Sequence, residues 1–160
     1  KPIQDVFSNI MGRFSDLDPD QLANADFLQE NFAFTGELFL GHLRYGTYGK
    51  NDIENLHPFL RQNNWRTRNL VVAGNFNMTN VDELFNVLIE IGQHPKQKSD
   101  TVTVLEKIGH YLDVENQTRF DALKAEGLDN RTISERIADT LDLGSVLKSS
   151  ASDFGGGYVM

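Results

Sequence analysis

Three stretches in the second half of the chain carry apolar residues three or four positions apart, the spacing of one helix face. The first begins at Asn80, where Glu83 completes a capping pattern, the second follows Ser99, a suitable N-cap, and the third begins at Thr132 with Glu135. Their apolar positions, in chain order, are Leu84, Val87, Leu88, Ile91, Val102, Leu105, Ile108, Leu112, Ile133, Ile137 and Leu141. Each of these amphipathic helices must bury its apolar face against another layer.

Short segments next to glycine or proline supply the expected strands. Residues 37–44 alternate between apolar and polar side chains well enough to predict one strand, bounded by Gly36 and Gly46. Residues 57–60 predict a short extended piece. Residues 61–68 are polar and predict a turn into a buried strand over residues 69–75. A last strand begins at the glycines 155–157. This order is compatible with a layered α/β or α+β domain in which helices cover a sheet.

The first part of the chain predicts two helices. Over residues 3–14 the apolar residues recur at helical spacing. Asp18 and Pro19 then provide an N-cap and a first-turn proline for a helix that runs to about Phe32. Later in the chain, residues 113–130 are charged and are expected to be helical in part.

Composition limits the class of protein. The chain has 160 residues, 39% hydrophobic and 24% charged, which is ordinary for one domain with a core. It contains no cysteine, so hydrophobic burial must carry the fold without disulfides or thiolate zinc sites. The formal charge of −8 argues against a nucleic-acid partner, which needs a clustered basic face.

The ends of the chain give two further expectations. No apolar run approaches the roughly 20 residues that span a bilayer, and the first four residues do not resemble a secretory leader, so we expect a cytoplasmic protein without a membrane partner. The chain begins without methionine in an expected helix and stops where its last strand begins. We therefore expect a piece of a longer polypeptide.

Two charged residues are candidates for ligand binding. Arg44 lies near the end of an expected strand, where a guanidinium can hold a carboxylate through two parallel hydrogen bonds. Asp100 follows the cap Ser99, and the first turn of a helix favours the ionised carboxylate that an ammonium group needs. Taken alone, an arginine in this position is usually a surface or ion-pair residue, and an aspartate in the position of Asp100 by default only helps to cap its helix.

Asn75 is the third candidate. It ends the expected strand over residues 69–75, and its side-chain amide can donate to a developing oxyanion. The alternative is that Asn75 is a turn asparagine and Phe76 a core aromatic residue. His57, beside Pro58, is assigned a scaffold role.

Three ordered motifs connect these candidates. Residues 41–46 (Gly-His-Leu-Arg-Tyr-Gly), 75–80 (Asn-Phe-Asn-Met-Thr-Asn) and 99–101 (Ser-Asp-Thr) resemble the glutamine-binding motifs of class II glutamine amidotransferases. The glutaminase domains of that family are N-terminal-nucleophile hydrolases. Tyr45, together with Thr79, Asn80 and Gly156–Tyr158, favours the amidophosphoribosyltransferase branch over the glucosamine-6-phosphate synthase branch, which remains an alternative.

The resemblance implies a role for each residue. Arg44 would hold the α-carboxylate of L-glutamine with Thr47 beside it, and Asp100 would bind the α-amino group. Asn75 and the backbone N–H of Phe76 would form the oxyanion hole. Phe76 replaces the family's glycine, and a positive φ there would strain it by about 1–2 kcal/mol.

The resemblance also implies an architecture and partners. Residues 1–160 would be part of a four-layer αββα sandwich, with antiparallel sheets covered by helices, truncated at both ends. The family's nucleophile is an N-terminal cysteine, so this fragment alone should be inactive. The ammonia would pass to a phosphoribosyltransferase domain that follows the chain, for phosphoribosylamine formation in purine biosynthesis, and the protein could form a homo-oligomer.

Several alternatives remain. The chain could be a non-catalytic amino-acid-binding or regulatory module derived from such a domain, or an acidic helical interaction domain with coincidental motifs. No histidine has metal-ligand spacing, so we expect no metal. We also expect no cofactor in this fragment, because no glycine-rich loop leads from a strand into a helix.

Overall fold

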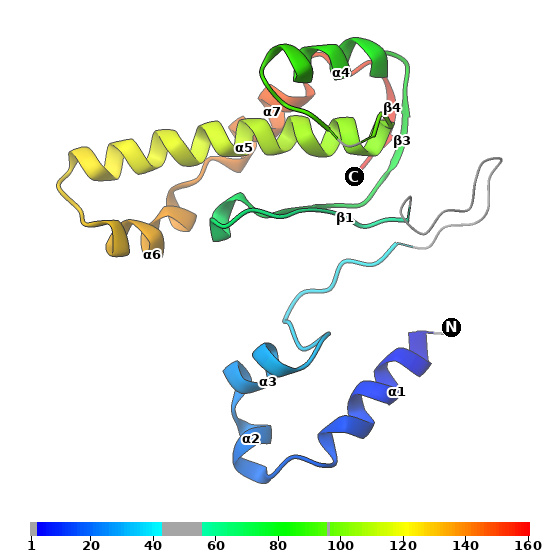
Figure 1. Ribbon diagram of the computed structural model, residues 1–160, viewed down its shortest axis with the longest axis vertical. Helices are drawn as coiled ribbons and strands as arrows, with labels where there is room; N and C mark the ends of the chain where they lie inside the picture. The colour runs from blue at the N-terminus through cyan, green and yellow to red at the C-terminus, as the bar shows by residue number, and fades with distance from the viewer. Residues whose placement is uncertain (1–2, 43–55, 96) are drawn as a thin grey trace. The chain divides into compact units, whose positions relative to one another are not determined.

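The computed structural model describes residues 3–42, 56–95 and 97–160 (Figure 1). The chain divides into two compact units, residues 1–40 and residues 41–160, and each is described by itself. Within the described ranges, no helix combines the length and apolar character needed to cross a membrane.

The first unit contains three helices, α1 (Ile3–Phe14), α2 (Pro19–Ala23) and α3 (Ala25–Asn31). The N-cap at Asp18 is confirmed, because its side chain accepts the backbone N–H of Gln21 in a capping box. The single helix expected up to Phe32 is wrong. Asn24 is extended (φ −96°, ψ 99°) and its side chain caps α3 instead of continuing α2.

The strand expected over residues 37–44 is absent from its described part, residues 37–42. Leu38 is 92% exposed, and Phe39 and Leu40 are each 53% exposed. Alternation predicts a strand only where a second strand supplies hydrogen bonds, and residues 37–42 pair with no described strand. Residues 43 and 44 of this prediction lie outside the described residues.

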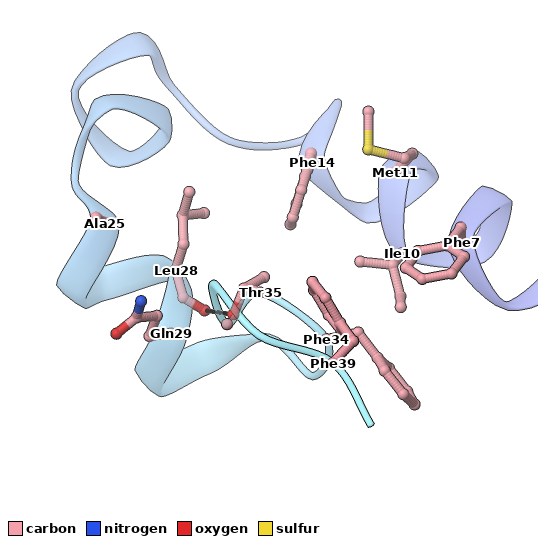
Figure 2. Close-up of a pocket in the computed structure, with 11 residues that line it drawn as sticks. Phe7, Ile10, Met11, Phe14, Ala25, Leu28, Gln29, Phe34, Thr35 and Phe39 are labelled. Atoms are coloured by element: carbon pink, nitrogen blue, oxygen red, sulfur yellow. Dashed lines mark hydrogen bonds between the residues drawn. The ribbon is translucent and has the colours of Figure 1, made fainter. Parts of the chain in front are cut away.

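The first unit contains an open apolar pocket of about 290 Å³ (Figure 2). Side chains converge on it from α1, from α3 and from the segment that follows α3. Its aromatic lining consists of Phe7, Phe14, Phe34 and Phe39. The helical spacing predicted over residues 3–14 thus supplies the α1 side of this pocket.

The second unit is built around α5 (Asp100–Ala125), a helix of 26 residues. Three helices pack against it: α4 (Val81–Glu90), α6 (Asn130–Thr140) and α7 (Leu143–Ala151) (Figure 1). The partly helical segment expected over residues 113–130 belongs to α5 up to Ala125.

The end of the helical region differs from the prediction. The N-cap of α6 is Asp129, whose carboxylate accepts the N–H groups of Arg131 and Thr132, so the cap expected at Thr132 is wrong. An aspartate one turn earlier reaches the same free N–H groups. Leu141 lies beyond the end of α6, and α7 was not predicted, because Asp142 starts a new helix by accepting the N–H of Ser145.

Four short strands form two antiparallel sheets. In the first, β1 (Phe59–Arg61) pairs with β2 (Leu70–Val72), and a 3₁₀ turn, η2 (Arg66–Arg68), lies between them. In the second, β3 (Asn75–Met78) pairs with β4 (Gly156–Val159), so the last predicted strand is confirmed. The described residues therefore form an α+β arrangement of helices and small antiparallel sheets.

The strand predicted over residues 69–75 is confirmed only over Leu70–Val72 (β2), because Asn75 begins β3, which belongs to a different sheet. Gly74 lies between the two strands. A Cβ atom on Gly74 would approach the Val159 carbonyl oxygen to 2.4 Å and the Phe76 ring to 2.7 Å. The chain can make this close turn only with a residue that has no side chain.

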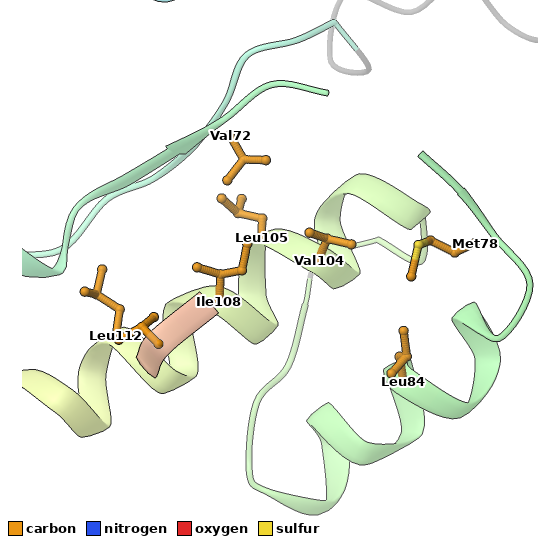
Figure 3. Packing of buried hydrophobic residues seen from close by; sticks show 8 residues of the cluster. Val72, Met78, Leu84, Val104, Leu105, Ile108 and Leu112 are labelled. Atoms are coloured by element: carbon orange, nitrogen blue, oxygen red, sulfur yellow. The ribbon is translucent and has the colours of Figure 1, made fainter. Parts of the chain in front are cut away.

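The main core lies between α5, the hairpin of β1 and β2, β3, α4 and α7 (Figure 3). Leu105 points from α5 toward Val72 of β2, and Val104 toward Met78 of β3 (Figure 3). Leu84 and Leu88 of α4 are 1% and 0% exposed. A second cluster joins the end of α5 to α6 through Leu123, Ile133 and Ile137.

A polar contact fixes β1 on α5. Arg61 crosses the helix at Gly109 and pairs with Glu106 (3.1 Å) and Asp113 (2.6 Å). Burial lowers the pKa of Arg61, but the hydrogen bonds and charges of Asp113 and Glu106 outweigh it, and the pKa is raised above its ordinary value. Arg61 is therefore permanently charged where β1 meets α5.

Candidate functional site

The two edges of β3 differ in what their N–H groups meet. The register of β3 and β4 continues to Thr79, whose N–H donates to the carbonyl of Gly155 at 2.9 Å. N–H groups along an antiparallel strand point alternately to its two edges. Those of Phe76 and Met78 are therefore directed away from β4, toward the start of α5.

The N–H of Met78 confirms this direction, because it donates to Oδ2 of Asp100 at 2.9 Å. Asp100 is the first residue of α5, and Ser99 caps the helix by accepting the N–H of Val102, as the sequence predicts. The helix start thus places the Asp100 carboxylate on the edge of β3 to which the N–H of Phe76 points.

His57 lies at the other end of the same edge. Its Nδ1 accepts the backbone N–H of Gly74 at 3.3 Å, and its Nε2 lies 3.3 Å from Oγ1 of Thr101. Because Nδ1 accepts, the neutral ring carries its proton on Nε2 and donates it to the threonine hydroxyl. A single imidazole therefore joins the residue before β3 to the first turn of α5.

Aromatic contacts surround the His57 ring. His42 stacks on it with centroids 4.7 Å apart and planes inclined by 27°. Phe76 lies 6.2 Å away, nearly parallel at 19°, and Phe59 meets the ring edge to face at 5.1 Å. His42 belongs to the first motif and Phe76 to the second, so the ring contacts both.

The structure brings together part of the predicted site. Phe76 and Asp100 lie at the same edge of β3. Asn75 begins β3 and has an exposed side chain, so the prediction that it ends the preceding strand is wrong. Arg44 and Thr47 lie outside the described residues. Their roles stay predictions.

Phe76 carries no strain from a positive φ. It lies in a paired strand opposite Tyr158, and among the described residues Phe34 is the one non-glycine residue with positive φ. The glycine that the family motif contains is therefore not required by φ at this position, and the N–H donor of Phe76 is retained.

The capping role predicted for Asn80 is wrong. Asn80 stands at the N-cap position of α4, but its side chain makes no capping hydrogen bond. It reaches the chain end instead: Oδ1 accepts the N–H of Gly155 at 2.9 Å, and Nδ2 donates to the Asp153 carbonyl at 2.8 Å. Asn80 thereby holds the segment that leads into β4.

Charged groups near this segment have their own partners. Lys107, only 3% exposed, pairs with Asp153, and its ammonium lies 5.4 Å from the centre of the Phe154 ring. In the described ranges, no group of three or more histidine, aspartate or glutamate side chains is arranged to hold a metal ion.

A cavity of about 710 Å³ lies elsewhere in the second unit, between β1, α5 and the connection from α4 to α5. Phe59, Arg61, His94 and Glu106 are among its lining residues. None of Asn75, Phe76 and Asp100 lines it, so this cavity is not the site that the motifs indicate.

Sequence reasoning missed the contribution of three residues: His57, Gly74 and Thr101. Gly74 and Thr101 stand next to Asn75 and Asp100, so their position in the chain could have drawn attention to them. His57 lies 17 residues before Gly74 and 44 before Thr101. Only the fold brings its ring to both, although the scaffold role assigned to it agrees with these contacts.

Comparison with known proteins gives one partial similarity. Over 87 residues, 54% of this chain, the sequence is 31% identical to an amidophosphoribosyltransferase of Archaeoglobus fulgidus. The chain spans 19% of the length of that curated relative. No protein-family model and no solved structure matches the chain. Over the matched stretch, the chain is a distant homologue of an amidophosphoribosyltransferase.

Proposed function

We propose that this chain is the glutamine-binding part of an amidotransferase that hydrolyses glutamine to glutamate and ammonia, with phosphoribosylamine formation in purine biosynthesis as its role. The proposal includes the four-layer αββα fold, of which the described helices and antiparallel sheets would be a part. Its support is the order of the three motifs, together with the partial similarity to an amidophosphoribosyltransferase.

The observation that carries the proposal is the shared edge of β3. The N–H of Phe76 points toward the edge at which Asp100 accepts the N–H of Met78. A carboxylate can accept several hydrogen bonds, so Oδ1 of Asp100 can receive an ammonium group while Met78 holds Oδ2 in place. An anion-stabilising donor and an ammonium acceptor on one edge suit a substrate with an amide at one end and an α-amino group at the other.

In the proposed reaction, Arg44 and Thr47 hold the α-carboxylate of glutamine and Asp100 holds its α-amino group. A cysteine thiolate, supplied by a segment upstream of these residues, attacks the side-chain amide carbon and forms a C–S bond. The carbonyl oxygen becomes an oxyanion that Asn75 and the N–H of Phe76 stabilise. The proton taken from the thiol goes to the leaving nitrogen, which departs as ammonia, and water then cleaves the thioester to glutamate.

The test measures ammonia release from glutamine by the full protein that carries these 160 residues. We expect Asp100→Asn and Arg44→Ala to raise KM about tenfold or more, because each removes a charged hydrogen bond worth about 1.5–3 kcal/mol. Asp82→Asn is the matched control, since Asp82 lies in the first turn of α4 with its side chain 81% exposed. Unchanged kinetics in both site variants would refute the assignment.

A second candidate is a non-catalytic amino-acid-binding or regulatory module, because recognition of glutamine by charged side chains needs no nucleophile. It uses the same clamp of Arg44 and Asp100 without chemistry. Calorimetry of glutamine binding and the ammonia assay together separate the two candidates. A full protein that binds glutamine and releases no ammonia is the module, and one that does both is the amidotransferase.

A further inference from the structure

The His57 ring contacts all three motif segments of the proposed site. It stacks on His42 of the first motif and on Phe76 of the second, and it touches Thr101 of the third. It also accepts the N–H of Gly74, the residue that precedes the second motif. These segments are far apart in the chain, and each is proposed to supply one part of glutamine recognition.

We propose that His57 is a positioning residue that aligns the segments of His42, Phe76 and Thr101, so that the N–H of Phe76 and the carboxylate of Asp100 meet glutamine together. This inference rests on the proposed function. His57 itself does not touch glutamine. It acts through Gly74 and Thr101, whose neighbours in the chain are Asn75 and Asp100.

Two hydrogen bonds of opposite direction make the alignment specific. Nδ1 must accept from Gly74 and Nε2 must donate to Thr101, which fixes the orientation of the ring between β3 and α5. Gly74 cannot move away freely, because the space of its missing Cβ is filled by the Val159 carbonyl and by the Phe76 ring. A shift of the ring therefore changes the position of Phe76 and of the α5 start together.

Substitutions can separate hydrogen bonding from ring packing. Glutamine at position 57 offers a carbonyl acceptor and an amide donor on one planar group, so His57→Gln can replace both hydrogen bonds without the aromatic stack. His57→Phe keeps the stack and loses both hydrogen bonds. His57→Ala loses both features, and His94→Ala is the control, because His94 is an exposed histidine of the same unit.

The experiment measures two quantities on the full protein, the Kd of L-glutamine by calorimetry and amide hydrogen exchange in peptides covering residues 73–80 and 98–104. We expect His57→Ala and His57→Phe to weaken glutamine binding about tenfold, as for the loss of one or two neutral hydrogen bonds, and to speed exchange in both peptides. His57→Gln should restore both quantities to near the wild-type values.

Three results would overturn the inference. One is wild-type glutamine affinity in His57→Ala. Another is a His57→Phe protein that binds glutamine as tightly as His57→Gln, which would reduce the role of His57 to packing. The third is faster exchange in only one of the two peptides. If the wild-type protein itself does not bind glutamine, the proposed function fails, and the paired response of the two peptides alone then decides whether His57 aligns the segments.

Discussion

Replacing Asn80 by alanine should detach the segment that leads into β4. The Asn80 side chain makes two hydrogen bonds to backbone groups more than 70 residues away, accepting from Gly155 and donating to the Asp153 carbonyl. The half-buried Gly155 also accepts from Thr79 and precedes Gly156, whose φ is +114°. The contacts of Asn80 therefore hold the turn that sets the register of β3 and β4.

The size of the effect follows from the two hydrogen bonds. Each neutral hydrogen bond contributes about 0.5–1.5 kcal/mol net, and a half-buried N–H left without an acceptor adds to the loss. We expect Asn80→Ala to lower the free energy of unfolding by about 2 kcal/mol. For a chain of this length that corresponds to a fall in melting temperature of about 4–8 °C.

Urea unfolding and amide hydrogen exchange test this prediction. Asn77→Ala is the matched control, because Asn77 is an exposed asparagine of β3, three residues before Asn80, and we expect it to change stability by less than about 0.5 kcal/mol. Exchange should rise at residues 153–158 in Asn80→Ala. If it rises only in the first turn of α4, Asn80 acts as a helix cap and its proposed role in holding the chain end is refuted.

Three further predictions concern the second unit. Gly109→Ala places a methyl group 2.4 Å from Cδ and Nε of Arg61, so it should destabilise the protein by about 1 kcal/mol in urea unfolding. In an Arg61→Met background, Gly109→Ala should instead stabilise the protein by about 0.5–1 kcal/mol, because alanine favours the helix. A change in the free energy of unfolding of the same sign in both backgrounds would contradict the contact between Arg61 and Gly109. Leu88→Ala empties a fully buried position and should cost about 3 kcal/mol in the same assay, with a cost below about 1 kcal/mol as the contrary result. Hydrogen bonds from the backbone N–H of Asp142 and from Arg119 lower the pKa of Glu115 below its ordinary 4.5. Because the pKa is lowered in the folded protein, the ionised carboxylate stabilises the fold above pH 4.5, and this stabilisation is lost as the pH falls through the folded-state pKa. The difference in melting temperature between wild type and Glu115→Gln should therefore shrink on acidification. A difference that does not change with pH would contradict this prediction.

Local patterns predicted the helices of the second unit best. Helical spacing located α4 and most of α5, and the cap at Ser99 is confirmed. These features depend on neighbours within one or two turns, which the sequence displays directly. The strand at the chain end is confirmed as well, because the glycines at its start mark a turn.

Three of the errors arose where a distant partner, or the lack of one among the described residues, decides the local structure. Asn80 fits a helix cap by sequence, but Gly155 and Asp153 take its hydrogen bonds. Residues 37–42 alternate like a strand and pair with none of the described strands. The break between β2 and β3 depends on Gly74, whose missing side chain leaves room for Val159. None of these partners is adjacent in the chain.

In the candidate site, too, the sequence indicated single residues, whereas their contacts with distant segments depend on the fold. The motifs singled out Phe76 and Asp100, and the fold gives the direction of the Phe76 N–H and the contact between Asp100 and Met78. The alignment by His57 could not be predicted, because it depends on a ring that reaches segments 17 and 44 residues away.

The most direct test of the central claim compares two ligands in two proteins. L-glutamine and 4-carbamoylbutanoate differ only in the α-amino group that Asp100 is proposed to bind. In calorimetry with the full wild-type protein, loss of that group should weaken binding about tenfold or more, and in Asp100→Asn by no more than about threefold. Equal losses in the two proteins would contradict the claim that Asp100 recognises the α-amino group.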